Sequence, residues 1–217
     1  MKFDTAVIGG GFSGFAAAIS AAREGLKVIL IEKGNCMGGA ASNCLVQPFM
    51  PYVADINGEA VLLSRGIFEE ITDNFKKMYS DIDGVEITEK SLFLFNEEYM
   101  KVIFNRMAEE AGVTLLYHSY IIGAEMENGR VKSVKCSTTS GCFDIEADYF
   151  IDATGDANLA YICGYPFRLG RDSDNLCQPM TLCFRIANVD NDVCKNIPRD
   201  QINELYKKLQ KDGKITN

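Results

Sequence analysis

Three glycines and one acid near the N-terminus stand next to two short apolar runs. The run at residues 5–8 leads directly into Gly9, Gly11 and Gly14, and the run at residues 28–31 stops on Glu32. At this spacing the first glycine permits a tight turn, the second lets the backbone approach a pyrophosphate, and the third lets a helix lie against the sheet. The acid accepts hydrogen bonds from ribose hydroxyls and repels a 2′-phosphate. The pattern therefore predicts dinucleotide binding.

A helix and a second strand must hold these residues in place. The alanine-rich sequence after the loop predicts a helix from about Ser13, whose unpaired amides and positive dipole end would face a bound diphosphate. Residues 5–32 are therefore predicted to form a βαβ unit. Its expected cofactor-binding residues are Gly9, Gly11, Phe12, Ser13, Gly14, Glu32 and Lys33.

A second glycine pair, Gly38 and Gly39, follows the acid. Its backbone amides could reach the same pyrophosphate, or the pair could form an ordinary flexible loop. Further on, recurring apolar residues predict a helix over residues 59–79. Asn96 is expected to cap another helix, which ends at residues 111–112.

Short apolar runs then replace the helices. A strand is expected at residues 113–117, followed by runs at about 120–127, 130–138 and 142–147, the first two joined by an Asn-Gly turn. These three runs predict an antiparallel meander that returns the chain to a further strand and to the turn of Ala153, Thr154, Gly155 and Asp156. A plain NAD domain would continue alternating strands and helices instead. The pattern over residues 199–211 predicts an amphipathic helix.

Composition narrows the class of protein. The 217 residues are 47% hydrophobic and 24% charged, which is typical of a soluble globular protein with a full core. A net charge of -8 disfavours nucleic acid and anionic membranes as partners, and no apolar run is long enough to cross a bilayer.

The cysteines and the single histidine carry little signal. The eight cysteines include no C-x-x-C pair, so we expect no metal site and reduced thiols in a cytoplasmic protein. Cys136 and Cys142 flank the second meander turn and could face each other across paired strands. His118 is expected to be structural.

Taken together, these features resemble the flavin domain of glutathione-reductase-type FAD enzymes. More closely, residues 37–39, 151–156 and 178–182 are similar to the family called FAD-dependent oxidoreductase, and the likeness covers nearly all of residues 4–187. The resemblance implies an extended FAD, with adenosine at Glu32, pyrophosphate at the first glycine loop and the adenine edge near Ile121. It places Gly38, Gly39, Ala153, Thr154, Gly155 and Asp156 along the remaining cofactor path.

The same resemblance implies the fold and the domains. We expect an α/β protein with a doubly wound, Rossmann-like, three-layer FAD-binding domain at residues 1–163 and an antiparallel β-meander crossover. Residues 164–217 would begin an incomplete substrate or cap domain. Family members run longer and return to a late ring-binding strand, so we expect the N-terminal part of a larger protein.

The expected function is flavin-mediated transfer of a hydride or electrons to or from a small-molecule substrate, with NADH or NADPH as a candidate donor. A non-catalytic flavin-binding fragment or electron-carrier module is the alternative, and the meander disfavours an NAD-linked dehydrogenase. The sequence is compatible with a homo-oligomer. No catalytic residue can be named. The candidates near the flavin ring are Cys44, Gln47, Arg168, Arg171, Gln178 and Thr181. Arg168 and Arg171 could either clamp a substrate carboxylate or be solvated surface charges.

Overall fold

The computed structural model describes residues 1–47, 49, 52–79 and 95–215 of the chain. These residues form two compact units, Met1–Cys183 and Phe184–Asn217. The boundary expected after residue 163 lies inside the first unit and stays a prediction.

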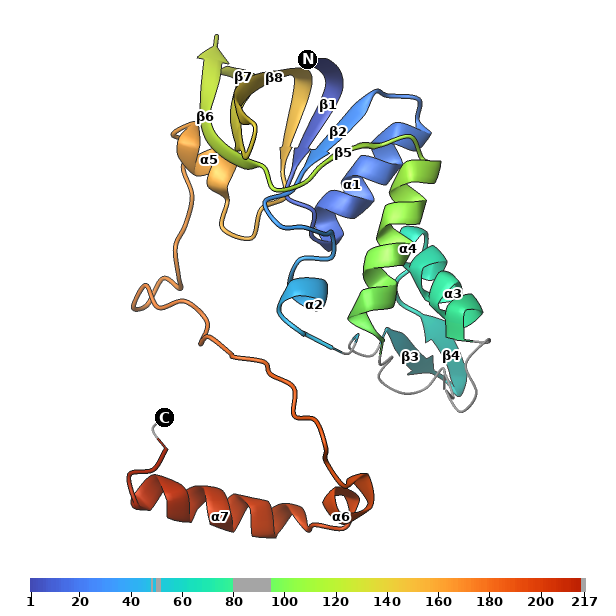
Figure 1. Ribbon diagram of the computed structural model, residues 1–217, viewed down its shortest axis with the longest axis vertical. Coiled ribbons are helices and arrows are strands. Elements are labelled where there is room, and N and C mark those ends of the chain that lie inside the picture. The colour runs from blue at the N-terminus through green and yellow to red at the C-terminus, as the bar shows by residue number, and fades with distance from the viewer. Residues whose placement is uncertain (48, 50–51, 80–94, 216–217) are drawn as a thin grey trace. The chain divides into compact units, whose positions relative to one another are not determined.

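A six-stranded sheet organises the first unit (Figure 1). Its centre is β1 (Lys2–Ile8), which pairs in parallel with β2 (Val28–Ile31) on one side and with β8 (Gly141–Asp152) on the other. The strand order is β5-β2-β1-β8-β7-β6, with β5 (Thr114–Leu116) parallel to β2. Strands β6 (Tyr120–Glu127) and β7 (Arg130–Thr138) complete the expected antiparallel meander. The predicted α/β fold is confirmed.

Helices cover one face of the parallel strands. Helix α1 (Phe12–Arg23) follows the glycine loop and begins one residue before the predicted start. Helix α4 (Glu97–Glu110) is the helix that Asn96 was expected to cap, and the Asn96 side chain accepts a hydrogen bond from the Glu98 backbone N–H at 2.8 Å. The two helices lie side by side (Figure 1), where the rings of Phe15 and Phe104 stack with centroids 3.9 Å apart.

The meander covers the opposite face. Successive side chains of a strand point to opposite faces of the sheet, so Val7 packs toward α1 and α4 whereas Ala6 and Ile8 pack the other way. On that second face they meet Val134 and Ile145 of the meander, both fully buried. Helices, parallel strands and meander therefore make the three predicted layers.

The helix predicted over residues 59–79 is wrong in its first part. Strands β3 (Val53–Ile56) and β4 (Glu59–Leu62) form an antiparallel hairpin, and α3 (Ile67–Tyr79) begins only afterwards. Asn57 and Gly58 form the turn, both with positive φ, at 57° and 87°. An Asn-Gly pair favours this type of turn, and here turn chemistry outweighed the helical spacing of the apolar residues.

The strand expected after the meander is not a separate element. Strand β8 runs unbroken: its first half is antiparallel to β7 up to Glu146, and its second half is parallel to β1. In this register Cys136 lies opposite Phe143 and Cys142 lies opposite Ser137. The two cysteines therefore point to opposite faces, and the expectation that they could face each other is wrong. All eight cysteines are free thiols.

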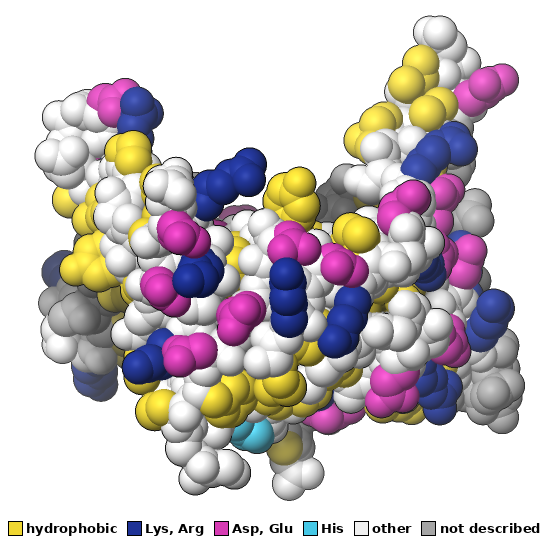
Figure 2. Space-filling model, turned by 90° about the horizontal axis from the view of Figure 1, so that it is seen from above, with side chains coloured by type: hydrophobic (Ala, Val, Ile, Leu, Met, Phe, Trp, Pro, Cys, Tyr) yellow, Lys and Arg dark blue, Asp and Glu magenta, His cyan; other side chains and the backbone are white. Residues whose placement is uncertain are grey.

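Short helices complete the described chain. Helices α2 (Ala40–Asn43) and α5 (Asn158–Ile162) follow the two turns at the strand ends, and the second unit contains α6 (Asn191–Lys195) and α7 (Arg199–Lys211). Helix α7 confirms the predicted amphipathic helix. Among the described residues, no helix combines the length and the apolar character needed to span a membrane. Acidic and basic side chains lie interspersed on the face shown in Figure 2.

Candidate functional site

A cavity of about 410 Å³ opens where the parallel strands end. Strand β1 lies between β2 and β8, so the strand order reverses at β1. α/β sheets bind ligands at such a point, beyond the carboxyl ends of the strands. Of the predicted cofactor-binding residues, only Gly14 and Gly38 do not line the cavity. Those that do are Gly9, Gly11, Phe12, Ser13, Glu32, Lys33, Gly39, Ile121, Ala153, Thr154, Gly155 and Asp156.

The three glycines of the first loop serve different purposes. A Cβ on Gly14 would lie 1.8 Å from the carbonyl oxygen of Gly9, so α1 can approach β1 only with glycine here. Gly9 has φ of 99°, and a Cβ on it would lie 2.7 Å from the carbonyl oxygen of Ala153. A Cβ on Gly11 would meet nothing within 4 Å. Two glycines are thus required by the protein itself, whereas Gly11 leaves open space in the cavity.

The start of α1 offers hydrogen-bond donors to this space. No side chain caps the helix, and its first turn contains no acidic residue. The first amides of a helix have no intrahelical partner, and the positive end of the helix dipole favours an anion. Because Phe12 and Ser13 line the cavity, its wall at this point fits a diphosphate.

Glu32 is a buried carboxylate with acceptor capacity to spare. Its side chain is held by two backbone amides: Oε2 accepts from Gly10 N–H and Oε1 accepts from Gly34 N–H, each at 2.6 Å. The residue is only 7% exposed. A carboxylate has about four acceptor positions, so about two remain, and Glu32 lines the cavity. This arrangement fits a ribose that presents two hydroxyl groups.

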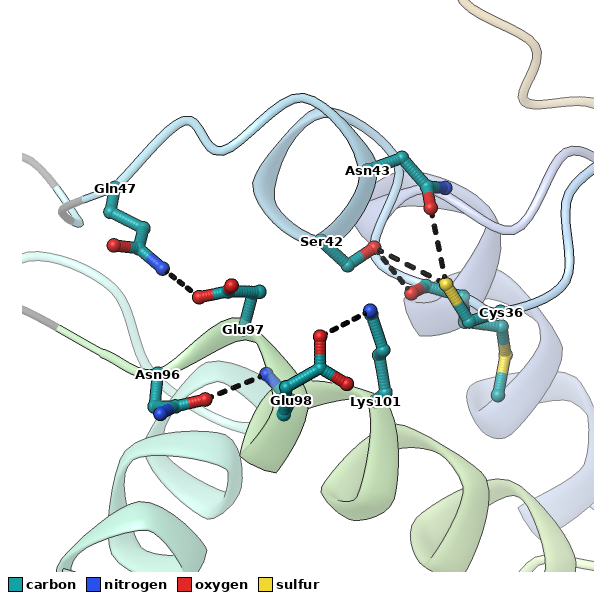
Figure 3. A network of polar contacts seen from close by, with 9 residues as sticks. Cys36, Ser42, Asn43, Gln47, Asn96, Glu97, Glu98 and Lys101 are labelled. Atoms are coloured by element: carbon teal, nitrogen blue, oxygen red, sulfur yellow. Dashed lines mark hydrogen bonds and ion pairs between the residues drawn. The ribbon is translucent and has the colours of Figure 1, made fainter. Parts of the chain in front are cut away.

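The second glycine turn packs against the first. Gly38 N–H donates to the carbonyl oxygen of Gly10 at 2.8 Å, so this amide is already used, and Gly39 lines the cavity instead. Behind the turn, the Ser42 hydroxyl donates to the carbonyl of Met37 at 2.6 Å. Further along, the Gln47 side chain donates to the buried Glu97 at the start of α4 (Figure 3). The contact between Gln47 and Glu97 links the segment after the turn to the helical layer.

Some residues that line the cavity were not predicted from the sequence. Ser119 and Tyr120 follow the third parallel strand, and the rule that ligands bind at the carboxyl ends of parallel strands could have found them. Asn43 belongs to a four-residue helix, α2, that carries no strong sequence signal. The further lining residues are Ile8, Ile31, Ala40 and Asn158.

Of the residues proposed near the flavin ring, only Cys44 lines the cavity. Arg168 lies 3.4 Å from Asp172, and Arg171 lies 2.7 Å from Asp174, with all four side chains exposed to solvent. These local ion pairs fit the interpretation of surface charges. Gln47, Gln178 and Thr181 do not line the cavity. The described part of the chain contains no group of three His, Cys, Asp or Glu side chains that could hold a metal.

Comparisons with known proteins agree with this geometry. The chain matches the family described as FAD dependent oxidoreductase over residues 4–214, and it belongs to that family. It is 27% identical over 159 residues to the mitochondrial dihydrolipoyl dehydrogenase of Schizosaccharomyces pombe, covering 71% of this chain and 28% of the relative. It is 37% identical over 123 residues to the glutathione reductase of Debaryomyces hansenii, covering 54% of this chain and 24% of the relative. The chain thus spans only about a quarter of the length of these relatives.

A solved structure shows the same fold. THI4 of Thermovibrio ammonificans superposes with a TM-score of 0.51 at 20% identity, covering 78% of this chain and 66% of the other. Family membership makes FAD the cofactor of this chain, and the uncapped helix, the space at Gly11 and the spare acceptors of Glu32 all fit it.

Proposed function

We propose that the cavity at the strand ends binds FAD and that the chain serves flavin-mediated transfer of a hydride or electrons to or from a small-molecule substrate. The observation that carries this proposal is the convergence of the glycine loop, the start of α1 and Glu32 on one cavity of about 410 Å³. Bound FAD supplies the redox chemistry, and the protein supplies position and electrostatics.

Each part of the cofactor has a proposed partner. The spare acceptor positions of Glu32 take the adenosine ribose hydroxyls, and the backbone near Ile121 meets the adenine edge. The amides at the start of α1 face the pyrophosphate. The remaining path runs past Gly39 and the turn of Thr154, Gly155 and Asp156, all of which line the cavity.

FAD titration of a glycine variant tests the binding site. Gly11→Val places a side chain in the space proposed for the pyrophosphate, and we expect at least about 100-fold weaker FAD binding, because several hydrogen bonds to charged groups would be lost. Gly123→Val is the matched control, since Gly123 lies outside the cavity and a Cβ there would come no closer than 3.8 Å to the nearest atom. A Gly11→Val variant that binds FAD as tightly as the parent does would contradict the proposed pyrophosphate site.

ADP competition tests which half of the cofactor this chain recognises. The proposed contacts are concentrated on the nucleotide, at residues 9–14 and Glu32. We therefore expect ADP to displace FAD with nearly equal affinity. Strong preference for FAD would mean that contacts to the flavin ring contribute much more than the proposed set provides.

Anaerobic mixing with a nicotinamide separates the enzyme from the alternative. NADH or NADPH is the proposed donor, and loss of the visible flavin absorption band would report reduction of the bound cofactor. Reoxidation by a small-molecule acceptor should then restore the band. FAD that is bound but never reduced by either donor would favour a flavin-binding module without catalysis of its own.

A further inference from the structure

The turn after β8 is held by a carboxylate that does not reach the cavity itself. Asp152 is the last residue of β8, and it is absent from the wall that Thr154 and Gly155 line. Its Oδ1 accepts from the backbone N–H of Thr154 at 3.0 Å and from the Thr154 hydroxyl at 2.6 Å. Its Oδ2 accepts from Ala160 N–H at 2.9 Å. One carboxylate thus joins the strand end, the turn and helix α5.

The single hydrogen of the Thr154 hydroxyl is engaged within this network. The hydroxyl donates it to Asp152 and accepts a hydrogen bond from Asn158 N–H at 2.8 Å. The amides of Asn158 and Ala160 at the start of α5 are therefore satisfied by the protein. No hydroxyl hydrogen is left for a ligand. The turn can offer a ligand its backbone, together with the open space beside Gly155, where a Cβ would meet nothing within 4 Å.

The backbone of the turn also includes a residue in an unfavourable conformation, which the surrounding structure must support. Between Asp156 and α5, Ala157 adopts a left-handed conformation with φ of 53°, which side chains with a Cβ disfavour. Such a residue persists only when the surrounding structure fixes it. The hydrogen bonds of Asp152 and Thr154 close on both sides of this residue, to Thr154 before it and to Asn158 and Ala160 after it.

We infer that Asp152 and the Thr154 hydroxyl are positioning residues, which set the backbone of Gly155 and Asp156 against FAD without touching it. The inference rests on the proposed function, because it concerns the wall of the same cavity. It changes the expected role of Thr154, whose side chain would act through the turn rather than on the cofactor. It also assigns a role to Asp152, which was not among the predicted site residues.

The chemistry of the network suggests the variants. All three partners of Asp152 donate, and a carboxamide has a single acceptor oxygen, so Asp152→Asn must place an NH₂ group against a donor in either orientation. Thr154→Val removes the hydroxyl at nearly constant shape, whereas Thr154→Ser keeps it. Thr138→Val is the matched control, because the Thr138 hydroxyl also shapes a tight turn, donating to the carbonyl of Gly141, but lies outside the cavity.

The experiment is FAD titration of the purified full chain, with amide hydrogen exchange recorded without FAD. Asp152→Asn and Thr154→Val should each weaken FAD binding about tenfold. Thr154→Ser and Thr138→Val should stay within about twofold of the parent. The Asp152→Asn/Thr154→Val double variant should bind FAD little more weakly than either single variant, because both substitutions break the same network. Exchange at Asn158 and Ala160 should be faster in Asp152→Asn.

Other results would overturn the inference. If the parent binds FAD and Asp152→Asn binds it equally well, the inference fails while the proposed function stands. Fully additive losses in the double variant would show that the hydroxyl contacts FAD independently. Equal losses in Thr154→Ser and Thr154→Val would remove the hydroxyl from the explanation. A parent chain that does not bind FAD refutes the proposed function, and this inference with it.

Discussion

Glu32 and Asp152 stand at the ends of the two strands that flank β1, and the two carboxylates are used differently. Each accepts hydrogen bonds from backbone amides of the turns around it. Glu32 is buried, accepts one bond on each oxygen and lines the cavity. Asp152 is only partly buried, accepts three bonds and does not line it.

The difference shows that an acid at a strand end has no fixed role. The donors around the carboxylate decide how many acceptor positions remain and where they point. Asp152 uses its positions on its own turn and on α5, so it shapes the wall. Glu32 lines the cavity and keeps about two positions unused, so it can also bind a ligand.

Among the carboxylate variants, Glu32→Gln should have the largest effect. Both partners of Glu32 donate, so a carboxamide must direct its NH₂ group at Gly10 or Gly34 inside a buried site. We expect FAD binding about 100-fold weaker and a free energy of unfolding lower by about 2 to 3 kcal/mol, measured by FAD titration and urea denaturation.

Asp4→Asn is the matched control for Glu32→Gln. Asp4 also accepts from a backbone amide, that of Lys27 at 2.6 Å, but it is more exposed and lies away from the cavity. It should cost about 1 kcal/mol or less and leave FAD binding unchanged. If Glu32→Gln also left FAD binding unchanged, the proposed difference between Glu32 and Asp152 would disappear.

Asp152→Asn should destabilise the chain less than Glu32→Gln. Its network is partly exposed, so water can replace some of the lost hydrogen bonds, and we expect a loss of about 1 kcal/mol in urea denaturation. A loss as large as that of Glu32→Gln would mean that both acids serve mainly to stabilise the fold.

The thiol of Cys163 can report the charge of Asp152. Burial raises the pKa of Cys163, and the negative charge of Asp152 raises it further, because both disfavour the thiolate. Asp152→Asn removes the second cause, so the pKa of Cys163 should fall and alkylation should begin at lower pH. Mass spectrometry of pH-dependent alkylation measures this change.

Cys136 is the internal control for this measurement. Burial is the first cause that raises its pKa, to about 11, and the charge of Asp144 is the second. Asp152→Asn should leave its alkylation profile unchanged. A shift at both thiols would indicate general loosening of the fold rather than loss of one charge.

Glu70→Gln should have the smallest effect, because its carboxylate pairs at the surface. Glu70 accepts two hydrogen bonds from Arg23 at 2.7 Å, and both side chains are more than two-fifths exposed. The hydrogen bond from Arg23 lowers the pKa of Glu70. The pair therefore contributes to folding stability above the usual carboxyl pKa, and this contribution is lost as pH falls through the lowered pKa. We expect a loss of a few tenths of a kcal/mol at neutral pH, measured by denaturation across the acid range. A loss above about 1 kcal/mol would contradict this.

Local chemistry explains what could be predicted from the sequence. The glycine loop with Glu32, the cap at Asn96, the Asn-Gly turn of the meander and the periodicity of α7 each depend on residues a few positions apart. The hairpin at β3 and β4 had the same kind of signal, at Asn57 and Gly58. Its strands have only four residues each, too few for a clear strand alternation, and the apolar residues of β4 also fit the helical spacing that continues into α3.

The sequence by itself thus determined the fold class, the family and the group of residues at one edge of the sheet. Only the tertiary structure decided what those residues can do there. Strand register turned Cys136 and Cys142 to opposite faces. Neighbours brought together by folding left about two acceptor positions free on Glu32, directed three donors at Asp152 and engaged the single hydrogen of the Thr154 hydroxyl. A hydrogen-bonding group can satisfy only a limited number of partners, and which partners reach it depends on how distant segments pack.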